Sequence, residues 1–308
     1  MRSLLAGLAC AAALCAGASA MAQEPVRTAF YFVPRKGVLV LTPQVLYTLS
    51  DAFDSTFHGA RTAGVSLSQA SYGLQADYGV NRLLSLGAIV NYRVLETKTT
   101  LQSTGKSSTL TNEGWTDVTL YAHGLLPVRR NAALLYGLTA GLSPDRAEAA
   151  TALSRGNQFS GGHGLQPIAG AQMEFLPRHF LGLKTSYLKR FDRSQEGGAA
   201  VKTLSGGDDW ELGTLFYERS APRWLLSLAL SLDRIGDTRT DGALSASGYL
   251  TETAQIRGYL SLCPSLILIA GYGAQRLPPV TTGASGTSGT WLHTVGAAVR
   301  VRLLSARD

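Results

Sequence analysis

The stretch Trp-Leu-Leu-Ser-Leu-Ala-Leu-Ser-Leu-Asp, at positions 224–233, decides the fold of this chain. Its even-numbered positions carry only Trp and Leu, whereas the odd-numbered positions from 227 onward carry Ser, Ala, Ser and Asp. Successive side chains of a β-strand point to opposite faces, so a period of two is typical of a strand with one apolar and one polar face. The stretch therefore predicts a strand and not a helix.

The same alternation recurs along the rest of the chain, for example over residues 84–94 and 291–303. We count twelve such runs, and each is close to the ~9–11 residues that a tilted strand needs to cross a bilayer. The predicted strands cover residues 38–50, 64–79, 83–95, 115–126, 132–143, 165–176, 180–191, 209–219, 224–234, 249–262, 265–275 and 291–304.

The links between these runs alternate strictly in length. Short links at 80–82, 127–131, 177–179, 220–223 and 263–264 alternate with long links at 51–63, 96–114, 144–164, 192–208, 235–248 and 276–290. Outer-membrane barrels have short periplasmic turns and long extracellular loops. The sequence thus predicts an all-β protein, a transmembrane antiparallel β-barrel of about twelve strands over residues 38–304, in the cell outer membrane.

The N-terminus has the pattern of a secretory signal peptide. Arg2 precedes an uncharged apolar run, and small residues at 18, 20 and 22 offer cleavage sites, so we expect residues 1–22 to be removed. Residues 23–37 would form a periplasmic N-terminal segment or a partial plug, and 305–308 a C-terminal tail. The last strand does not end on an aromatic residue, so recognition by the barrel assembly machinery would use another strand signal.

Composition excludes several other classes of protein. Only 16% of the 308 residues are charged, against about 25% in an average soluble domain, and 45% are hydrophobic, which excludes a disordered chain. Two of the three cysteines lie in the signal peptide and leave only Cys263, which excludes a disulfide scaffold.

The four tryptophans lie at strand starts. Trp115, Trp210 and Trp291 follow long links, and Trp224 follows a short one. These are the places of the two aromatic girdles of a membrane barrel, where a ring lies between hydrocarbon and water. The alternative is that each is an ordinary core tryptophan. Trp115 fits least well, because it shares its parity with Asp117.

If the apolar parity faces lipid, the opposite parity lines the lumen, since a charge facing lipid at mid-depth costs about 2–4 kcal/mol. Ile267 and Ile269 also fall on the inward parity and would add an apolar patch for a hydrophobic solute. Either the inward charges line a permeation path, or they form a salt-bridged interior that only stabilises the barrel. The polar candidates are Asp77, Asn91, Arg93, Asp117, His123, Glu174, Lys184, Arg190, Glu211, Asp233, Gln255, Arg257 and Arg300.

Motifs for catalysis and for cofactors are missing from the sequence. We find no G-x-S-x-G elbow, no H-E-x-x-H, and no histidine pair at metal-ligand spacing. Residues 103–107 resemble the end of a phosphate loop, but its leading glycine is replaced by Thr100. We therefore expect no enzyme, no cofactor and no metal.

The net charge of +7 could suggest nucleic acid, but many of the arginines fall in the short links. There they suit lipid headgroups at the periplasmic rim. We expect outer-membrane lipid and a small-molecule solute as partners, and no nucleic acid.

Three segments resemble the phenol-degradation family of the MetA pathway, a family of proposed outer-membrane transporters. Residues 72–83 are similar to its strand, Tyr-Gly-Val-Asn-Arg-Leu turn and returning strand, and 114–120 to its Gly-x-Gly-Asp strand, with Thr116 in place of the second glycine. Residues 137–145 resemble its strand that ends in a Pro-containing loop, with Pro-Asp-Arg in place of Pro-Thr-Gly. The resemblance implies a barrel channel for aromatic or other small hydrophobic compounds, with no catalytic residues.

Three functions stay open at this point. The first is an outer-membrane channel or transporter for passive uptake of small solutes, including hydrophobic or aromatic ones. The second is an outer-membrane lipid hydrolase, which would need a nucleophile beside a histidine at the lipid-facing rim. The third is a structural or adhesive barrel that binds through its long loops.

Overall fold

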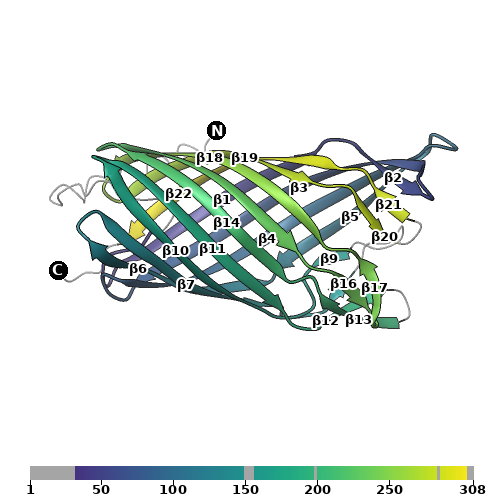
Figure 1. Cartoon of the computed structure of the whole chain (residues 1–308), viewed down its shortest axis with the longest axis horizontal. Helices are drawn as coiled ribbons and strands as arrows, with labels where there is room; N and C mark the ends of the chain where they lie inside the picture. Colours follow the sequence, from purple (N-terminus) through teal and green to yellow (C-terminus); the bar gives the residue numbers. More distant parts are fainter. Residues whose placement is uncertain (1–31, 149–155, 198–199, 283–284, 304–308) are drawn as a thin grey trace, which may run out of the picture.

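The computed structural model describes residues 32–148, 156–197, 200–282 and 285–303, and in these ranges the regular elements are β-strands. They form a closed antiparallel barrel of twelve wall strands (Figure 1). The wall runs in chain order through β1 (Leu39–Ser50), β3 (Ala60–Gly79), β4 (Leu84–Leu101), β6 (Val118–Arg129), β7 (Ala132–Leu142), β10 (Gly164–Leu176), β11 (His179–Arg190), β14 (Asp209–Ser220), β15 (Trp224–Ile235), β18 (Tyr249–Cys263), β19 (Leu266–Leu277) and β22 (Thr290–Leu303).

Each wall strand pairs with the next along the chain, and the last strand pairs with the first. In the closing pair of β1 and β22, Leu39 lies opposite Leu303 and Ser50 opposite Leu292. Closure leaves no unpaired strand edge, which a barrel in hydrocarbon requires because no water is there to bond free backbone groups. The strands predicted from the alternation agree with the wall strands to within about four residues at their ends, except that β4 continues to Leu101, beyond the predicted end at 95.

The fourth predicted strand is interrupted at Asp117, between β5 (Ser107–Thr116) and β6. Tyr92 of β4 pairs with Trp115, whereas Ile89 pairs with Thr119, so three residues of this strand lie opposite two of β4. Such a bulge changes the parity of the strand. Trp115 and Asp117 therefore need not face the same side of the wall, although both have odd numbers. Trp115 is exposed on the outer face, and Asp117 accepts a hydrogen bond from the backbone N–H of Ser160.

Many residues expected in long links are in fact paired strands. Residues 96–101 and 107–114 extend β4 and β5 into one hairpin, so the expected loop over 96–114 shrinks to 102–106. At the same end lie β2 (Phe53–Phe57), β20 (Val280–Thr282), β21 (Ser285–Thr287) and β9 (Gly156–Gln158), and a second sheet of β8 (Ala147–Glu148), β12 (Arg193–Gly197), β13 (Ala200–Gly206), β16 (Thr238–Thr240) and β17 (Ala243–Ala246) (Figure 1). We call this the long-loop end and the other the short-turn end.

The distribution of side chains is the reverse of that in a soluble protein. On β15, Leu228, Leu230 and Leu232 are 39%, 60% and 38% exposed, whereas Ser227 is 5% exposed. Large apolar side chains on the other wall strands are exposed in the same way. A soluble monomer rarely exposes so continuous an apolar surface, so this face is built to meet another apolar phase. Within the described ranges, no helix is long and apolar enough to span a membrane.

The first described residues enter the barrel at the short-turn end. The backbone N–H of Gly37 donates to the carbonyl of Gly79 over 2.8 Å, and that of Gly79 donates to Val38 over 3.0 Å. These bonds tie the start of β1 to the last residue of β3. The expected signal peptide, 1–22, and the tail, 305–308, lie outside the described residues, as does most of the 23–37 segment.

Candidate functional site

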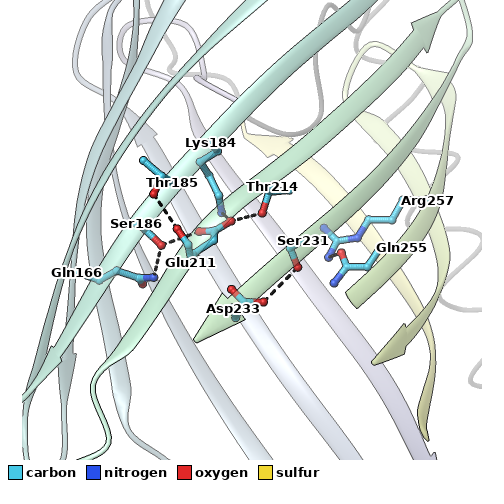
Figure 2. A network of polar contacts seen from close by, with 10 residues as sticks. All are labelled: Gln166, Lys184, Thr185, Ser186, Glu211, Thr214, Ser231, Asp233, Gln255 and Arg257. Carbon is cyan, nitrogen blue, oxygen red and sulfur yellow. Dashed lines mark hydrogen bonds and ion pairs between the residues drawn. The ribbon is translucent and has the colours of Figure 1, made fainter. Parts of the chain in front are cut away.

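A polar network around Glu211 crosses the interior face of β10, β11 and β14 (Figure 2). Glu211 is buried, and its carboxylate pairs with the ammonium of Lys184 over 3.0 Å. It also accepts hydrogen bonds from the hydroxyls of Ser186, over 2.6 Å, and Thr214. Ser186 in turn accepts a bond from the amide of Gln166 over 2.9 Å. A buried carboxylate needs this number of donors, because desolvation of an unpaired charge is expensive.

A β-bulge places these donors on one side of the sheet. Glu211 pairs with Asp233 across β14 and β15, whereas Gly213 pairs with Leu232, so Leu212 is the extra residue. Leu212 lies on the outer face and is exposed, and strand parity beyond it is reversed. For this reason Glu211 and Thr214, three positions apart, are both buried on the interior face.

The network forms one side of an interior cavity of about 470 Å³. Its walls come from six strands, β6, β10, β11, β14, β15 and β18, so it spans the lumen between opposite parts of the barrel. Asp233 accepts a bond from Ser231 over 3.2 Å, and Arg257 donates to Gln255 over 3.0 Å. The lining residues are His123, Ile168, Lys184, Glu211, Thr214, Ala229, Ser231, Asp233, Thr253, Gln255 and Arg257.

A second interior cluster lies closer to the short-turn end. Asp77 of β3, Gly87 of β4 and Tyr121 of β6 lie in one cross-strand row. A Cβ on Gly87 would collide with the ring of Tyr121, 2.2 Å away. Because Gly87 has no side chain, the tyrosine lies flat across β4 and donates its hydroxyl to Asp77. Gln75 donates to both groups, over 2.9 Å to Tyr121 and 3.0 Å to Asp77.

Phe32 lies against the interior wall beside this cluster. The Nε2 of His123 is 2.8 Å from the carbonyl oxygen of Phe32 and donates to it. The guanidinium of Arg300 lies 4.3 Å from the centre of the Phe32 ring and 6.0 Å from that of Tyr259. His123 lines the cavity, whereas Arg300 lies near the end of β22 at the short-turn end. Phe32 contacts both and therefore lies between the cavity and the short-turn end.

Arg300 is 8% exposed, and among the described residues its Nε and Nη1 have no hydrogen-bond partner. Its positive charge interacts electrostatically with the carboxylate of Asp77, and the aromatic faces of Phe32 and Tyr259 add cation–π contacts. Next to it Leu225, Tyr259 and Ile267 form a buried apolar cluster, against which Ile269 packs. The two isoleucines expected inside thus belong to the packing of the wall.

Arg93, Asp117 and Arg190 lie nearer the long-loop end. Asp117 accepts a bond from the backbone N–H of Ser160 over 3.0 Å and is close enough to Arg93 to interact with it electrostatically. Arg190 donates from its Nε to the carbonyl of Gly207 over 2.8 Å and from its backbone to Asp208.

Asp208 itself lies between β13 and β14, outside the wall strands. Burial alone would raise its pKa. The hydrogen bonds from Lys189, Arg190 and Tyr187 outweigh burial and lower the pKa of Asp208 below the ordinary value of an aspartate.

Glu174 and Asn91, both on the expected inward parity, lie outside the cavity lining. The carboxylate of Glu174 accepts the backbone N–H of Arg178 over 2.6 Å and so closes the short turn between β10 and β11. Asn91 lies beside the inward glycine Gly73, where a Cβ would be 2.2 Å from its Oδ1.

All four tryptophans are exposed on the outer face, between 41% and 59%. Trp115 and Trp210 make edge-to-face contacts with Tyr92 and Tyr187, at centroid distances of 5.7 and 6.3 Å. Trp224 lies under the guanidinium of Arg219, 5.6 Å away. An outer-face groove of about 1200 Å³, with Tyr72, Trp115 and Trp224 among its lining residues, belongs to this apolar surface and not to the lumen.

The sequence analysis missed several residues of the interior. Tyr121 shares the parity of His123 and could have been found from it. Phe32 precedes the first strand, and no periodicity includes it. Thr214 was hidden by the bulge, which reverses parity after Leu212. Within the described ranges, no three His, Cys, Asp or Glu side chains are grouped to hold a metal ion.

Comparisons with known proteins give a likeness of fold. No family model matches the sequence, and no curated protein matches it. A crystal structure of an outer membrane channel from Pseudomonas putida F1 matches with a TM-score of 0.62 and 13% identity, and covers 90% of this chain and 99% of that one.

Weaker matches are the transport unit of the autotransporter AIDA-I from Escherichia coli and the CymD monoaromatic hydrocarbon channel. Their TM-scores are 0.49 and 0.45, their identities 12% and 9%, and they cover 90% and 89% of this chain and 95% and 90% of their own. At these identities only the fold is shown. The chain has the closed β-barrel fold of outer-membrane proteins.

Proposed function

We propose that this protein is an outer-membrane channel for the passive uptake of small solutes, including hydrophobic or aromatic ones. The observation that carries the proposal is the cavity of about 470 Å³ inside a closed barrel. Its walls are mostly polar and charged, whereas the outer face of the same strands is apolar. In a barrel with a purely structural role we would expect side chains to fill this volume, as they do in eight-stranded barrels.

The proposed location is the outer membrane, with the short-turn end in the periplasm and the long-loop end outside. Loop length supports this orientation, because outer-membrane barrels keep their short turns periplasmic. Arg129, Arg178 and Arg223 lie at the short turns, where they can meet anionic headgroups. The proposed signal peptide, residues 1–22, would direct export across the inner membrane.

We propose further that residues 23–37 act as a partial plug. The contacts of Phe32 with His123 and Arg300 support this role, because they hold Phe32 against the interior wall toward the short-turn end. Gly37 fixes the point where the segment joins β1. In this proposal a solute that leaves the cavity toward the periplasm must pass or displace the segment.

Membership of the MetA-pathway phenol-degradation family is part of the proposal and rests on the three sequence segments. The segment 72–83 forms the end of β3 and the short turn that leads into β4, which agrees with the resemblance. Aromatic compounds as solutes follow from this resemblance and from the apolar part of the cavity wall, Ile168 and Ala229.

The proposed channel is not an enzyme. His293, the histidine at the lipid-facing rim, bonds the hydroxyl of Tyr272 over 2.7 Å and lies 3.6 Å from Asp51. Neither partner is the serine that a lipid hydrolase would need. An adhesive barrel would use the second sheet at the long-loop end, and it would not need an interior cavity.

Single-channel recording in a planar bilayer tests the proposal. Protein comprising residues 23–308, refolded in detergent, should give discrete current steps, and the boiled protein should give none. A chain that folds, as shown by a gel shift between unboiled and boiled samples, and yet never conducts, even without residues 23–34, would overturn the channel function.

A further inference from the structure

The charges around the interior cavity are distributed unevenly over its walls. On β11, β14 and β15, Lys184 lies between two carboxylates: it pairs with Glu211 over 3.0 Å and interacts electrostatically with Asp233. This side of the cavity therefore carries one negative charge in excess. On the next wall strand, β18, which pairs with β15, Arg257 exposes its side chain to the cavity.

Arg257 is held in place by uncharged groups. One guanidinium nitrogen, Nη2, donates to the amide oxygen of Gln255 over 3.0 Å. Its aliphatic part lies across Gly271, directly opposite on β19, where a Cβ would be 3.0 Å from Cγ of Arg257. The glycine thus leaves room for the arginine to lie along the wall instead of blocking the lumen.

The guanidinium has unused hydrogen-bonding capacity. An arginine has five N–H donors, and one of them is used by Gln255. In the described part of the chain, no ion pair includes Arg257, whereas Glu211 receives three side-chain donors and Asp233 receives Ser231. A guanidinium with unused N–H donors is suited to bind a carboxylate, because it can donate two parallel hydrogen bonds to the two carboxylate oxygens.

We propose that the cavity binds a small solute with a carboxylate group, which Arg257 holds while the body of the solute lies against Ile168 and Ala229. This site rests on the proposed channel function and adds the chemical class of the solute. Asp233 repels the same carboxylate and so keeps binding weak enough for release, as conduction requires.

The proposal makes opposite predictions for two substitutions. Arg257→Gln removes the binding group and should raise the benzoate concentration needed for half-block of the potassium current by roughly tenfold, the effect of losing one charged hydrogen-bonded contact. Asp233→Asn removes the repulsion and should lower that concentration several-fold. Arg276→Gln is the matched control, because it removes the same charge from the exposed pair with Glu252.

Benzamide and benzylammonium are the comparison solutes. Benzamide has the shape of benzoate without its charge, so it should block weakly and equally in all four proteins. Equal block by benzoate in the wild type and in Arg257→Gln overturns the site, and so does stronger block by benzylammonium than by benzoate.

Equilibrium dialysis of labelled benzoate against the folded protein in detergent keeps the two proposals separate. Binding that Arg257→Gln weakens, in a protein that does not conduct, supports the site and refutes the channel. Current steps in a protein whose benzoate binding does not depend on Arg257 support the channel and overturn the site.

Discussion

The two halves of the lumen are built on different principles. Toward the short-turn end, Arg300 is buried between the rings of Phe32 and Tyr259, and the neighbouring side chains are closely packed. In the middle of the barrel, Glu211 and Lys184 form one wall of a cavity that stays open. The same alternating strands build both halves. What differs is Phe32, which lies inside one of them. If residues 23–37 form the proposed plug, the closed half depends on a removable part and the open half on the wall itself.

The largest expected effect comes from removing that segment. Deletion of residues 23–34 takes away Phe32 but keeps Arg35 and Gly37, whose backbone groups bond Val38 and Gly79. The bore at the short-turn end should widen, and single-channel conductance should rise several-fold. If the truncated protein folds and its conductance equals that of the intact chain, the segment does not close the lumen.

Breaking the central network should affect stability instead. Glu211→Gln breaks the interior ion pair between Glu211 and Lys184, and breaking a buried pair costs about 3–5 kcal/mol in other proteins. The barrel should then lose its heat-resistant gel mobility at a clearly lower temperature.

Glu252→Gln is the control for this change. Glu252 pairs with Arg276 over 3.6 Å, and both side chains are more than half exposed. Its loss should cost only about 0–1 kcal/mol. Similar effects of the two changes would mean that the central network contributes no more than a surface ion pair.

Ion selectivity should respond less strongly. Replacing Arg93 and Arg300 by glutamine removes two positive charges from the interior, where screening is poor, and should shift selectivity toward cations. Arg93 should contribute more, because Arg300 lies behind Phe32. The reversal potential in a salt gradient measures the shift, and Leu228→Ala on the outer face should leave it unchanged. An unaltered reversal potential in a conducting double variant contradicts the inward placement of these arginines.

The contrast between the two halves also shows which features of the structure could be predicted from the sequence and which could not. Alternation over residues such as Leu226, Leu228 and Leu230 was enough to predict the wall, because a period of two is a local property of the chain. The bulge at Leu212 is not visible in that pattern, so Thr214 was missed. Phe32 fills the closed half through contacts with residues far along the chain, and no local signal encodes them. The predicted long links were longer than the observed loops. Polar strands such as β5 and β12 pair at the rim without a continuous apolar face, so the alternation of apolar residues did not reveal them.

The smallest expected effect concerns the rim, at Asp208. Its pKa lies below the ordinary value, because the bonds from Lys189, Arg190 and Tyr187 outweigh burial. A lowered pKa in the folded state stabilises the rim at pH above the unfolded value of about 3.9, and this contribution is lost as the pH falls through the folded value. The backbone N–H of Arg190 donates a hydrogen bond to Asp208 over 2.9 Å. Hydrogen exchange of this amide should therefore speed up below about pH 3.9, after correction for the pH dependence of the intrinsic exchange rate. Asp208→Asn should remove most of this pH dependence while the cavity network around Glu211 keeps its protection. If the amide of Arg190 in the wild type exchanges at the same corrected rate at pH 3 and pH 6, the carboxylate does not hold the rim.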